Sequence, residues 1–430
     1  MAIIAQMELF SWEQVEGLGD LDRLRLVLEH LPDETLVSQL ERARGNGRDD
    51  YPVRGLWNSL LAGVVFQHPS VESLRRELSR NGQLRALCGL RGVPPTWVYT
   101  RFFRVLFKYE ARIDAMFDKL VGELAELLPG FGQHLALDSK AISSFAKTKP
   151  RDESADGRRD VDANFGRKTY RGMRKDGTPW EKITKWFGYK LHLVVDSTYE
   201  LPVAFSLTKA SEADINAGKD LIHQMSVRQP TILERAEVLT ADKGYDAGPF
   251  LAELWDEYGI KPVIDIRSLW KDGDATRVLP GQTNVVYDQH GTVSCYCPAT
   301  GIRREMGNGG FEKDRGTLKK LCPAKHYGIE CKGRAACPVA GGLRVPLTVD
   351  RRIFTPVDRS SYAWKRLYKG RTAVERVNSR LDVSFGLEVH TIRGQRKMQF
   401  RAGLALCVML ALALGHIRER RPEKIRSLVA

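Results

Sequence analysis

The first 129 residues carry a helical pattern of apolar positions. Apolar residues occur as adjacent pairs every four residues between positions 56 and 65, which predicts a helix with one buried face. The pairs are Leu56–Trp57, Leu60–Leu61 and Val64–Val65. We therefore predict an all-helical segment over residues 1–129.

A basic helical face closes this segment. In TWVYTRFFRVLFKYE, Arg101, Arg104 and Lys108 share one face of a helix, while the aromatic and apolar residues point elsewhere. This pattern is compatible with a helix-turn-helix reader of DNA. It is equally compatible with a helical bundle whose outer helix is solvated by Arg and Lys.

From Gly130 onwards the pattern changes to short β-rich runs. The runs are HLALDSKAI, FGYKLHLVVDS, LPVAFSLTKA, AEVLTADKGYD and KPVIDI, and helical patterns cover residues 214–225 and 249–259. This order predicts an α/β fold with a mixed sheet that carries helices. The polar stretch between about 143 and 185 predicts a long flexible or ligand-facing loop. Residues 147–190 hold 13 Lys/Arg against 7 Asp/Glu.

Near the C-terminus, the stretch YKGRTAVERVNSRL (368–381) predicts one amphipathic helix. Val374, Val377 and Leu381 form an apolar stripe that can pack on a core. Tyr368, Arg371 and Glu375 lie on a polar stripe beside it. By itself this stretch favours an exposed helix with an Arg371–Glu375 pair over a metal site.

Composition and charge favour a soluble protein with a polyanionic partner, usually nucleic acid and sometimes an anionic membrane surface. The chain of 430 residues has a formal net charge of +14, and residues 351–430 alone hold 18 Lys/Arg against 6 Asp/Glu. Such an asymmetry predicts a polyanionic partner. No secretory signal is visible, and the apolar run at 402–417 is shorter than the roughly 20 residues of a membrane span, so we predict a buried C-terminal helix. Seven cysteines in a long chain do not resemble a disulfide framework, and we expect a cytoplasmic protein.

Two aspartates come directly after apolar strand residues. Asp138 ends the first strand run, and Asp242 ends the fourth. Ligands of α/β sheets collect at strand ends, although an aspartate there is often only a turn or cap residue. Two neighbouring carboxylates repel unless a cation lies between them, and oxygen-only ligation suits Mg²⁺. A third carboxylate from a helix would complete a site for metal-assisted phosphoryl transfer, and Glu375 is the candidate.

At this point the sequence resembles bacterial insertion-sequence transposases of the DDE type, which are built on a ribonuclease-H-like core. LALDSKAI resembles their first-aspartate strand, WFGYKLHLVVDS the strand that follows, and TADKGYDAG their second-aspartate motif. Tyr368-x2-Arg371-x3-Glu375 matches the tyrosine–arginine–glutamate signature of one large subgroup. The resemblance covers most of the chain, since the region from YPVRGLWNSLL to TRFFRVLFK also resembles the helical domain that precedes the core in relatives.

The resemblance implies roles for the residues that match. Asp138, Asp242 and Glu375 would be the ligands of Mg²⁺ or Mn²⁺, and Tyr368 and Arg371 would contact DNA phosphate near the cleaved bond.

One position departs from the signature. It continues with a lysine seven residues after the glutamate, and here that position is Asp382. Either Asp382 faces away from DNA, or the phosphate-contacting role has passed to Arg376 or Arg380. Lys243, in DKGYD, is a further candidate for DNA contact, with a backbone-turn role for this loop as the alternative.

Five cysteines gather between KPVIDI and the Glu375 helix. They are Cys295, Cys297, Cys322, Cys331 and Cys337, with His326 among them. This composition is typical of zinc knuckles in an inserted subdomain. The predicted structural ligands of Zn²⁺ are Cys297, Cys322, Cys331 and Cys337, with Cys295 and His326 as alternates. Free thiols in an insertion are the competing interpretation.

Together these patterns predict four segments. A helical DNA-end-binding domain would cover 1–129, the catalytic core 130–270 and 351–430, and a cysteine-rich insertion 271–350. The predicted function is that of an insertion-sequence transposase, nucleoid-associated, which binds inverted repeats, cleaves DNA and joins strands as a dimer or larger oligomer, without a membrane. The alternatives are a ribonuclease-H-like nuclease without joining activity and a catalytically silent transposase-derived DNA-binding protein.

Overall fold

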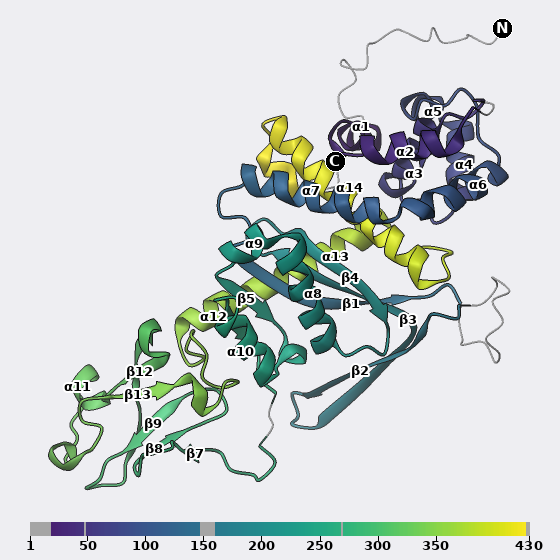
Figure 1. The fold of residues 1–430 in the computed structure, drawn as a ribbon. Helices are drawn as coiled ribbons and strands as arrows, with labels where there is room; N and C mark the ends of the chain where they lie inside the picture. Colours follow the sequence, from purple (N-terminus) through teal and green to yellow (C-terminus); the bar gives the residue numbers. More distant parts are fainter. Residues whose placement is uncertain (1–18, 47–48, 147–159, 268–269, 427–430) are drawn as a thin grey trace, which may run out of the picture.

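The fold is taken from a computed structural model that describes residues 19–46, 49–146, 160–267 and 270–426. Three regions follow one another diagonally in Figure 1: a group of helices, a mixed sheet with its own helices, and two small sheets. The described parts of the chain thus combine a helical N-terminal region with an α/β core, as the sequence predicts. The division into four segments stays a prediction.

The N-terminal region is helical throughout its described residues. It contains α1 (Asp20–His30), α2 (Glu34–Arg44), α3 (Val53–Val65), α4 (Val71–Arg80), α5 (Gly82–Leu87), α6 (Thr96–Leu106) and α7 (Ala111–Leu127). All six apolar residues of the face predicted between positions 56 and 65 are buried on α3. The prediction of that face is therefore confirmed.

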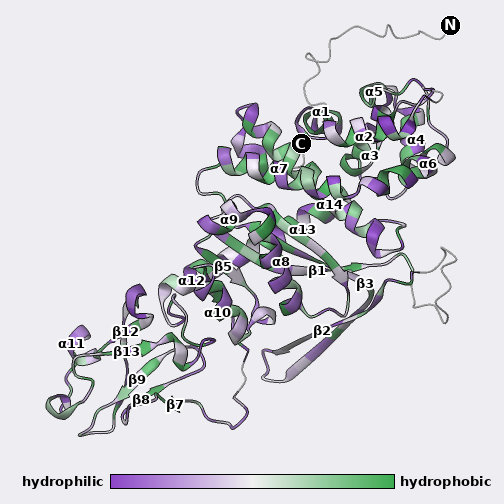
Figure 2. Ribbon diagram, in the orientation of Figure 1, coloured by the Kyte–Doolittle hydropathy of each residue, from purple (hydrophilic) through white to green (hydrophobic). Residues whose placement is uncertain are grey.

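The C-terminal helix α14 (Gln395–Arg418) joins this region to the sheet. It packs against α1, α3 and α7 on one side and against β4 (Leu201–Lys209) on the other. Its length and hydropathy would suffice to cross a membrane, but 89% of its apolar window is buried inside the protein. The long apolar ribbon in Figure 2 is thus a core helix, as predicted.

The central sheet has the order β2-β3-β1-β5-β6, and β4 also pairs with β3. The strands are β1 (His134–Ser143), β2 (Asn164–Met173), β3 (Pro179–Asp196), β5 (Val238–Ala241) and β6 (Lys261–Ile264). β1, β5 and β6 are parallel neighbours, and β3 runs antiparallel to β1. Helices α8 (Asp214–Arg228), α9 (Pro230–Arg235) and α10 (Gly248–Asp256) accompany it. This is the predicted mixed sheet.

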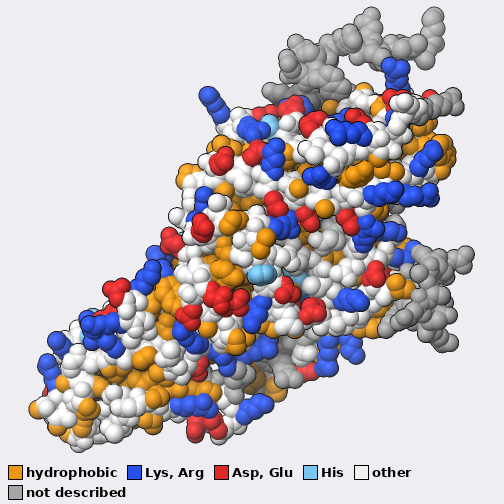
Figure 3. Space-filling model, in the orientation of Figure 1, with side chains coloured by type: hydrophobic (Ala, Val, Ile, Leu, Met, Phe, Trp, Pro, Cys, Tyr) orange, Lys and Arg blue, Asp and Glu red, His pale blue; other side chains and the backbone are white. Residues whose placement is uncertain are grey.

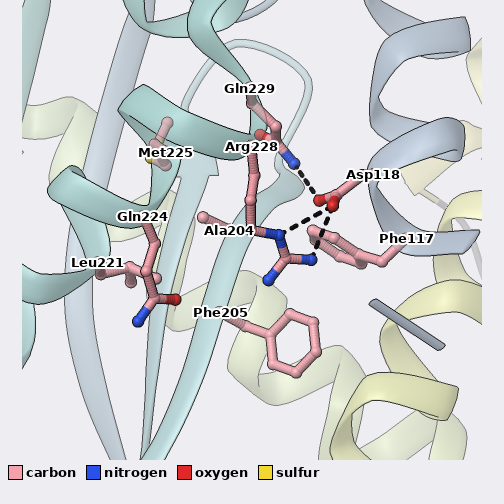
Figure 4. Close-up of a pocket in the computed structure, with 9 residues that line it drawn as sticks. All are labelled: Phe117, Asp118, Ala204, Phe205, Leu221, Gln224, Met225, Arg228 and Gln229. Carbon is pink, nitrogen blue, oxygen red and sulfur yellow. Dashed lines mark hydrogen bonds and ion pairs between the residues drawn. The ribbon is translucent and has the colours of Figure 1, made fainter. Parts of the chain in front are cut away.

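A charged contact fixes the helical region to the sheet. Arg228, the last residue of α8, donates to the Asp118 carboxylate of α7 over 2.9 Å, and Gln229 donates to its other oxygen over 2.9 Å. Figure 4 shows both side chains pointing at Asp118 beside the ring of Phe117. The polar contact lies next to the apolar packing of Phe117 on Phe205, whose rings meet edge to face at 5.0 Å.

The prediction of a loop at about 143–185 is partly wrong. Residues 147–159 lie outside the described residues, but β2 pairs with the first half of β3 from Asn164 to Gly188 and forms a long hairpin that projects from the sheet. Glycines make room for its indole rings: a Cβ on Gly166 would meet the Trp186 ring at 2.3 Å, and one on Gly172 would meet Trp180 at 2.7 Å. Cross-strand packing therefore stabilises a stretch that is polar in composition.

Residues 271–350, here called the cysteine-rich segment, form two small sheets. One has the order β10-β9-β8-β7 and the other β11-β12-β13. The strands are β7 (Arg277–Val278), β8 (Val285–Tyr287), β9 (Val293–Tyr296), β10 (Arg303–Glu305), β11 (Gly307–Glu312), β12 (Thr317–Leu321) and β13 (Leu343–Pro346), with the short helix α11 (Pro323–Tyr327) after β12. The segment has a hydrophobic cluster separate from the main core.

The prediction of a single helix over residues 368–381 is wrong at the start of this range. Tyr368 ends the helix α12 (Tyr362–Tyr368), a 3₁₀ turn covers Lys369–Arg371, and α13 runs from Thr372 to Phe385. The chain tightens around Gly370, whose lack of a side chain weakens an α-helix. The predicted apolar stripe is confirmed, since Val374, Val377 and Leu381 are fully buried.

Candidate active site

The two aspartates lie at adjacent positions of neighbouring parallel strands. Asp242 directly follows β5, but the prediction that Asp138 ends its strand is wrong, because β1 continues to Ser143 in its pairing with β3. Leu137 of β1 is paired in register with Ala241 of β5, so Asp138 and Asp242 follow side by side. Burial, followed by the negative charge of Asp242, raises the pKa of Asp138 to about 6. The structure thus brings together two carboxylates that repel each other in a low-dielectric environment.

Local hydrogen bonds orient both carboxylates. Ser139 N–H donates to Asp138 Oδ1 over 2.7 Å, and Gly244 N–H donates to Asp242 Oδ1 over 2.7 Å. The second bond caps the 3₁₀ turn Lys243–Tyr245 that follows β5. Asp242 therefore caps the turn with Oδ1. Its Oδ2 takes no part in this cap.

Arg371 links this pair to Glu375. Its guanidinium lies 3.7 Å (Nη1) from Asp138 Oδ2 and 2.8 Å (Nη2) from Glu375 Oε1. The buried stripe of α13 holds the helix against β1 and β3, which places Glu375, in the first turn, at the edge of the site. Within the described ranges, no three His, Cys, Asp or Glu side chains are grouped as a metal site. Glu375 is held by Arg371 instead.

Tyr368 lies beside the same arginine. The Arg371 guanidinium is 5.9 Å from the centre of the Tyr368 ring, and the Trp364 ring stacks on Tyr368 with the two ring centres 4.8 Å apart. Burial, followed by the charge of Asp265, raises the pKa of Tyr368 to about 12. The hydroxyl therefore stays protonated at neutral pH and can donate a hydrogen bond to an anionic oxygen.

A polar layer beneath the aspartates was not found from the sequence. Ser139 donates to Asp214 Oδ1 over 3.0 Å, and Lys190 Nζ lies 2.9 Å from the same oxygen. Tyr245 is fully buried next to it, and a Cβ on Gly218 of α8 would meet its ring at 2.9 Å. The chain brings these residues together from four separate elements, and no local spacing signals the contact.

Asp382, which stands where the signature has a lysine, forms an ion pair within the chain. Asp382 pairs with Lys140 of β1, two residues beyond Asp138, and the same ammonium lies 2.6 Å from Glu388. A lysine from the strand therefore faces the aspartate on the helix and binds its Oδ2, while the buried Oδ1 of Asp382 has no hydrogen-bond partner among the described residues.

The other candidates for DNA contact are spread over the molecule. Arg376 and Arg380 both bond to the Glu200 carboxylate, at 2.7 and 2.9 Å. Lys243 is exposed beside Asp242. Three further candidates, Arg101, Arg104 and Lys108, are exposed on α6 and the turn after it.

The cysteines of the cysteine-rich segment converge. Cys295, Cys297, Cys322, Cys331 and Cys337 all line one small cavity, and all are free thiols. His326 does not line this cavity and instead packs against the Tyr327 ring at 4.5 Å.

A mixed sheet with Asp138 inside β1 and Asp242 directly after the parallel strand β5, with helices around it, is consistent with a ribonuclease-H-like DDE domain. The model of the family described as "Transposase DDE domain" matches residues 129–411. The chain therefore belongs to the DDE transposase family. Among curated proteins, none matches the sequence.

Proposed function

We propose that this protein is the transposase of a bacterial insertion sequence, which binds the inverted repeats of its element, cleaves their ends and joins the freed 3′-hydroxyl to target DNA. The observation that carries the proposal is the pairing of Asp138 with Asp242 on parallel strands, with Arg371 linking Asp138 to Glu375. Membership of the DDE transposase family supports DNA as the substrate.

In this proposal Asp138, Asp242 and Glu375 hold Mg²⁺ or Mn²⁺. The donor set fits such an ion, because it consists of carboxylate oxygens only and because Asp138 and Asp242 crowd each other on neighbouring strands. When bound, divalent ions supply an activated oxygen nucleophile and stabilise the leaving oxygen of a phosphoryl displacement. Ser139 N–H and Gly244 N–H keep the aspartates oriented for this task.

Tyr368 and Arg371 bind the DNA phosphate at this site. A guanidinium recognises phosphate and carboxylate with the same forked geometry, and Arg371 already holds carboxylate oxygens of Asp138 and Glu375. Lys243 adds a cation beside Asp242. Arg376 and Arg380, which Glu200 holds, contribute to the positive field of α13 in this proposal and reach phosphate only if they exchange this partner.

The projecting β2–β3 hairpin supports DNA as the ligand. Residues 164–187 hold seven Lys/Arg against two Asp/Glu, and Figure 3 shows blue side chains on this arm. Its Lys168 is close enough for its charge to lower the pKa of Asp138 against the larger effect of burial. Phosphate contacts of this kind supply sequence-independent affinity.

The helical region, with Arg101, Arg104 and Lys108 exposed, is the proposed reader of the element ends. Cutting both ends of one element requires a dimer or a larger oligomer on the DNA. The proposed location is the cytoplasm, at the nucleoid.

A joining assay with a pre-cleaved element end tests the proposal. We expect the wild-type protein and Mg²⁺ to give joined product, and Asp138→Asn or Glu375→Gln to lose more than the roughly 10–100-fold that loss of an outer-shell contact costs. Asp256→Asn, which changes a carboxylate at the end of α10 that pairs with Arg351, is the matched control.

The outcome also separates the alternatives. Cleavage without joined product would indicate a nuclease. DNA binding without any processing by the wild-type protein would indicate a silent DNA-binding protein. Unchanged processing by Asp138→Asn would show that the catalytic assignment is wrong.

A further inference from the structure

The cysteine-rich segment has little hydrophobic core for its size. Its strands are two to six residues long, and it contributes nine of the eleven buried apolar residues of the separate cluster. In chains of up to about 80 residues a single small core supplies little stability, and natural mini-proteins add disulfides or a metal ion to it. All five cysteines of the segment are free thiols. A disulfide therefore does not supply the missing stabilisation.

The five thiols converge although 42 positions separate the first from the last. They come from β9, from the end of β12, and from two turns before β13, yet all line one small cavity. The chain's other two cysteines, Cys88 and Cys407, are buried in the main hydrophobic core. The convergence is thus a property of this segment alone.

Four of the five cysteines begin a tight turn. The carbonyls of Cys297 and Cys322 accept the N–H four residues further on, from Gly301 and His326. The carbonyls of Cys331 and Cys337 accept the N–H three residues further on, from Arg334 and Ala340. Such turns present a thiol at the corner of the chain, and proline follows three of these cysteines.

Cys295 differs from these four. It lies within β9, paired with Val285 on one side and Arg304 on the other, so its backbone is fixed in the sheet. The turns at Cys297 and Cys331 also fit closely together: a Cβ on Gly333 would lie 3.1 Å from the Cys297 sulfur and 2.8 Å from the Ala299 nitrogen. Only glycine allows this approach, which brings the two turns into contact.

We propose that Cys297, Cys322, Cys331 and Cys337 bind one structural Zn²⁺ ion, and that Cys295 is not a ligand. Four thiolates in tetrahedral geometry form a closed site without catalytic water. Among the described residues the thiols line the cavity wall without yet forming a tight group. In this proposal the four sulfurs move toward one another when the ion binds. Binding forms four Zn–S bonds and releases the thiol protons to solvent.

Zinc content of the full-length protein, purified without chelator, tests this proposal. We expect about one equivalent in the wild type and in Cys295→Ser, and less than about half in Cys331→Ser and in Cys322→Ser. Cys295→Ser is the matched control because it removes a thiol from the same cavity.

Wild-type protein with no bound zinc would overturn the proposal, as would equal zinc in all four proteins. Loss in Cys295→Ser with retention in Cys331→Ser would overturn the ligand assignment.

A second measurement needs no variant that might fail to fold. After zinc is removed from the wild-type protein, Co²⁺ is added back. We expect saturation at about one equivalent, with intense thiolate-to-metal charge-transfer absorption and the visible bands of tetrahedral Co²⁺. Absence of these bands would contradict the site. Neither the zinc measurement nor the Co²⁺ measurement involves DNA. A negative result in either is therefore distinguishable from a failure of the proposed transposase activity.

Discussion

At the scale of single residues, the crowding of Asp138 against Asp242 has a measurable effect on stability. An unfolded aspartate titrates near pH 4, whereas burial and the neighbouring carboxylate raise the pKa of Asp138 to about 6 in the folded protein. The folded state therefore binds this proton more tightly. The resulting stabilisation is complete below about pH 4 and is lost as the pH rises through about 6.

Asp138→Asn removes the repulsion and keeps an oxygen that can accept from Ser139 N–H. In EDTA at pH 8 we expect the variant to be more stable than the wild type by about 2 kcal/mol, and at pH 4 we expect no difference. Urea denaturation at both pH values measures this. A variant that is less stable than the wild type at pH 8 would contradict the repulsion.

Residue types could be predicted at this scale, and contacts could not. Asp138, Asp242 and Glu375 follow from strand ends, helix periodicity and resemblance, because each has a local signal. The bond from Ser139 to Asp214, and the contact of Tyr245 with Gly218, join residues whose separations in sequence carry no pattern. Arg371 was predicted beside Glu375, but its approach to Asp138 depends on the packing of α13 on β1.

At the scale of elements, the contact of β1 with α13 depends on Lys140. Its ammonium pairs with Asp382 and Glu388, and the Lys140 side chain is only 12% exposed. Without the ammonium, two carboxylates would remain near each other at this junction, and a partly buried charge without its partner is costly.

We expect Lys140→Met to lower the free energy of unfolding by about 1–3 kcal/mol, and Asp382→Asn to recover part of this loss in the double variant. Denaturant unfolding of the wild type, both single variants and the double variant gives the coupling energy. Strict additivity of the two changes would show that the pair does not couple the strand to the helix.

The β2–β3 hairpin and the break between α12 and α13 were predicted wrongly because the pattern of apolar residues marks neither of them. The β2–β3 hairpin projects from the sheet, and large apolar side chains on it, such as Phe165, Met173 and Ile183, are exposed, so no alternation of buried apolar residues marks it. Likewise, the break between α12 and α13 leaves the apolar stripe of α13 intact, so periodicity alone cannot show where the helix begins. β1, β5 and β6 were predicted correctly because burial requires their apolar sequence.

At the scale of the whole molecule, the two faces of the hairpin are expected to differ in their contact with DNA. Successive side chains of a strand point to opposite faces. On β3, Lys182 therefore lies on one face of the hairpin and Lys185 on the other. Lys168, whose charge acts on Asp138, shares its face with Thr184 across the ladder, and hence with Lys182.

We expect Lys182→Ala to lower the slope of log affinity against log salt by about one, because each phosphate contact contributes roughly that amount. Lys185→Ala, an equal change of charge on the opposite face, should leave the slope nearly unchanged. Salt-dependent binding to a duplex of unrelated sequence measures both. Equal effects of the two substitutions would contradict a DNA path along the Lys182 face.

The central claim is that Asp138, Asp242 and Glu375 act by holding metal ions, and Asp242→Cys tests it most directly. A thiolate binds Mg²⁺ poorly and softer divalent ions better. In the joining assay we predict that Asp242→Cys is inactive with Mg²⁺ and regains activity with Mn²⁺, whereas Asp242→Ala stays inactive with both. Equal behaviour of Asp242→Cys and Asp242→Ala in the two metals, or full activity of either with Mg²⁺, would contradict metal ligation by Asp242.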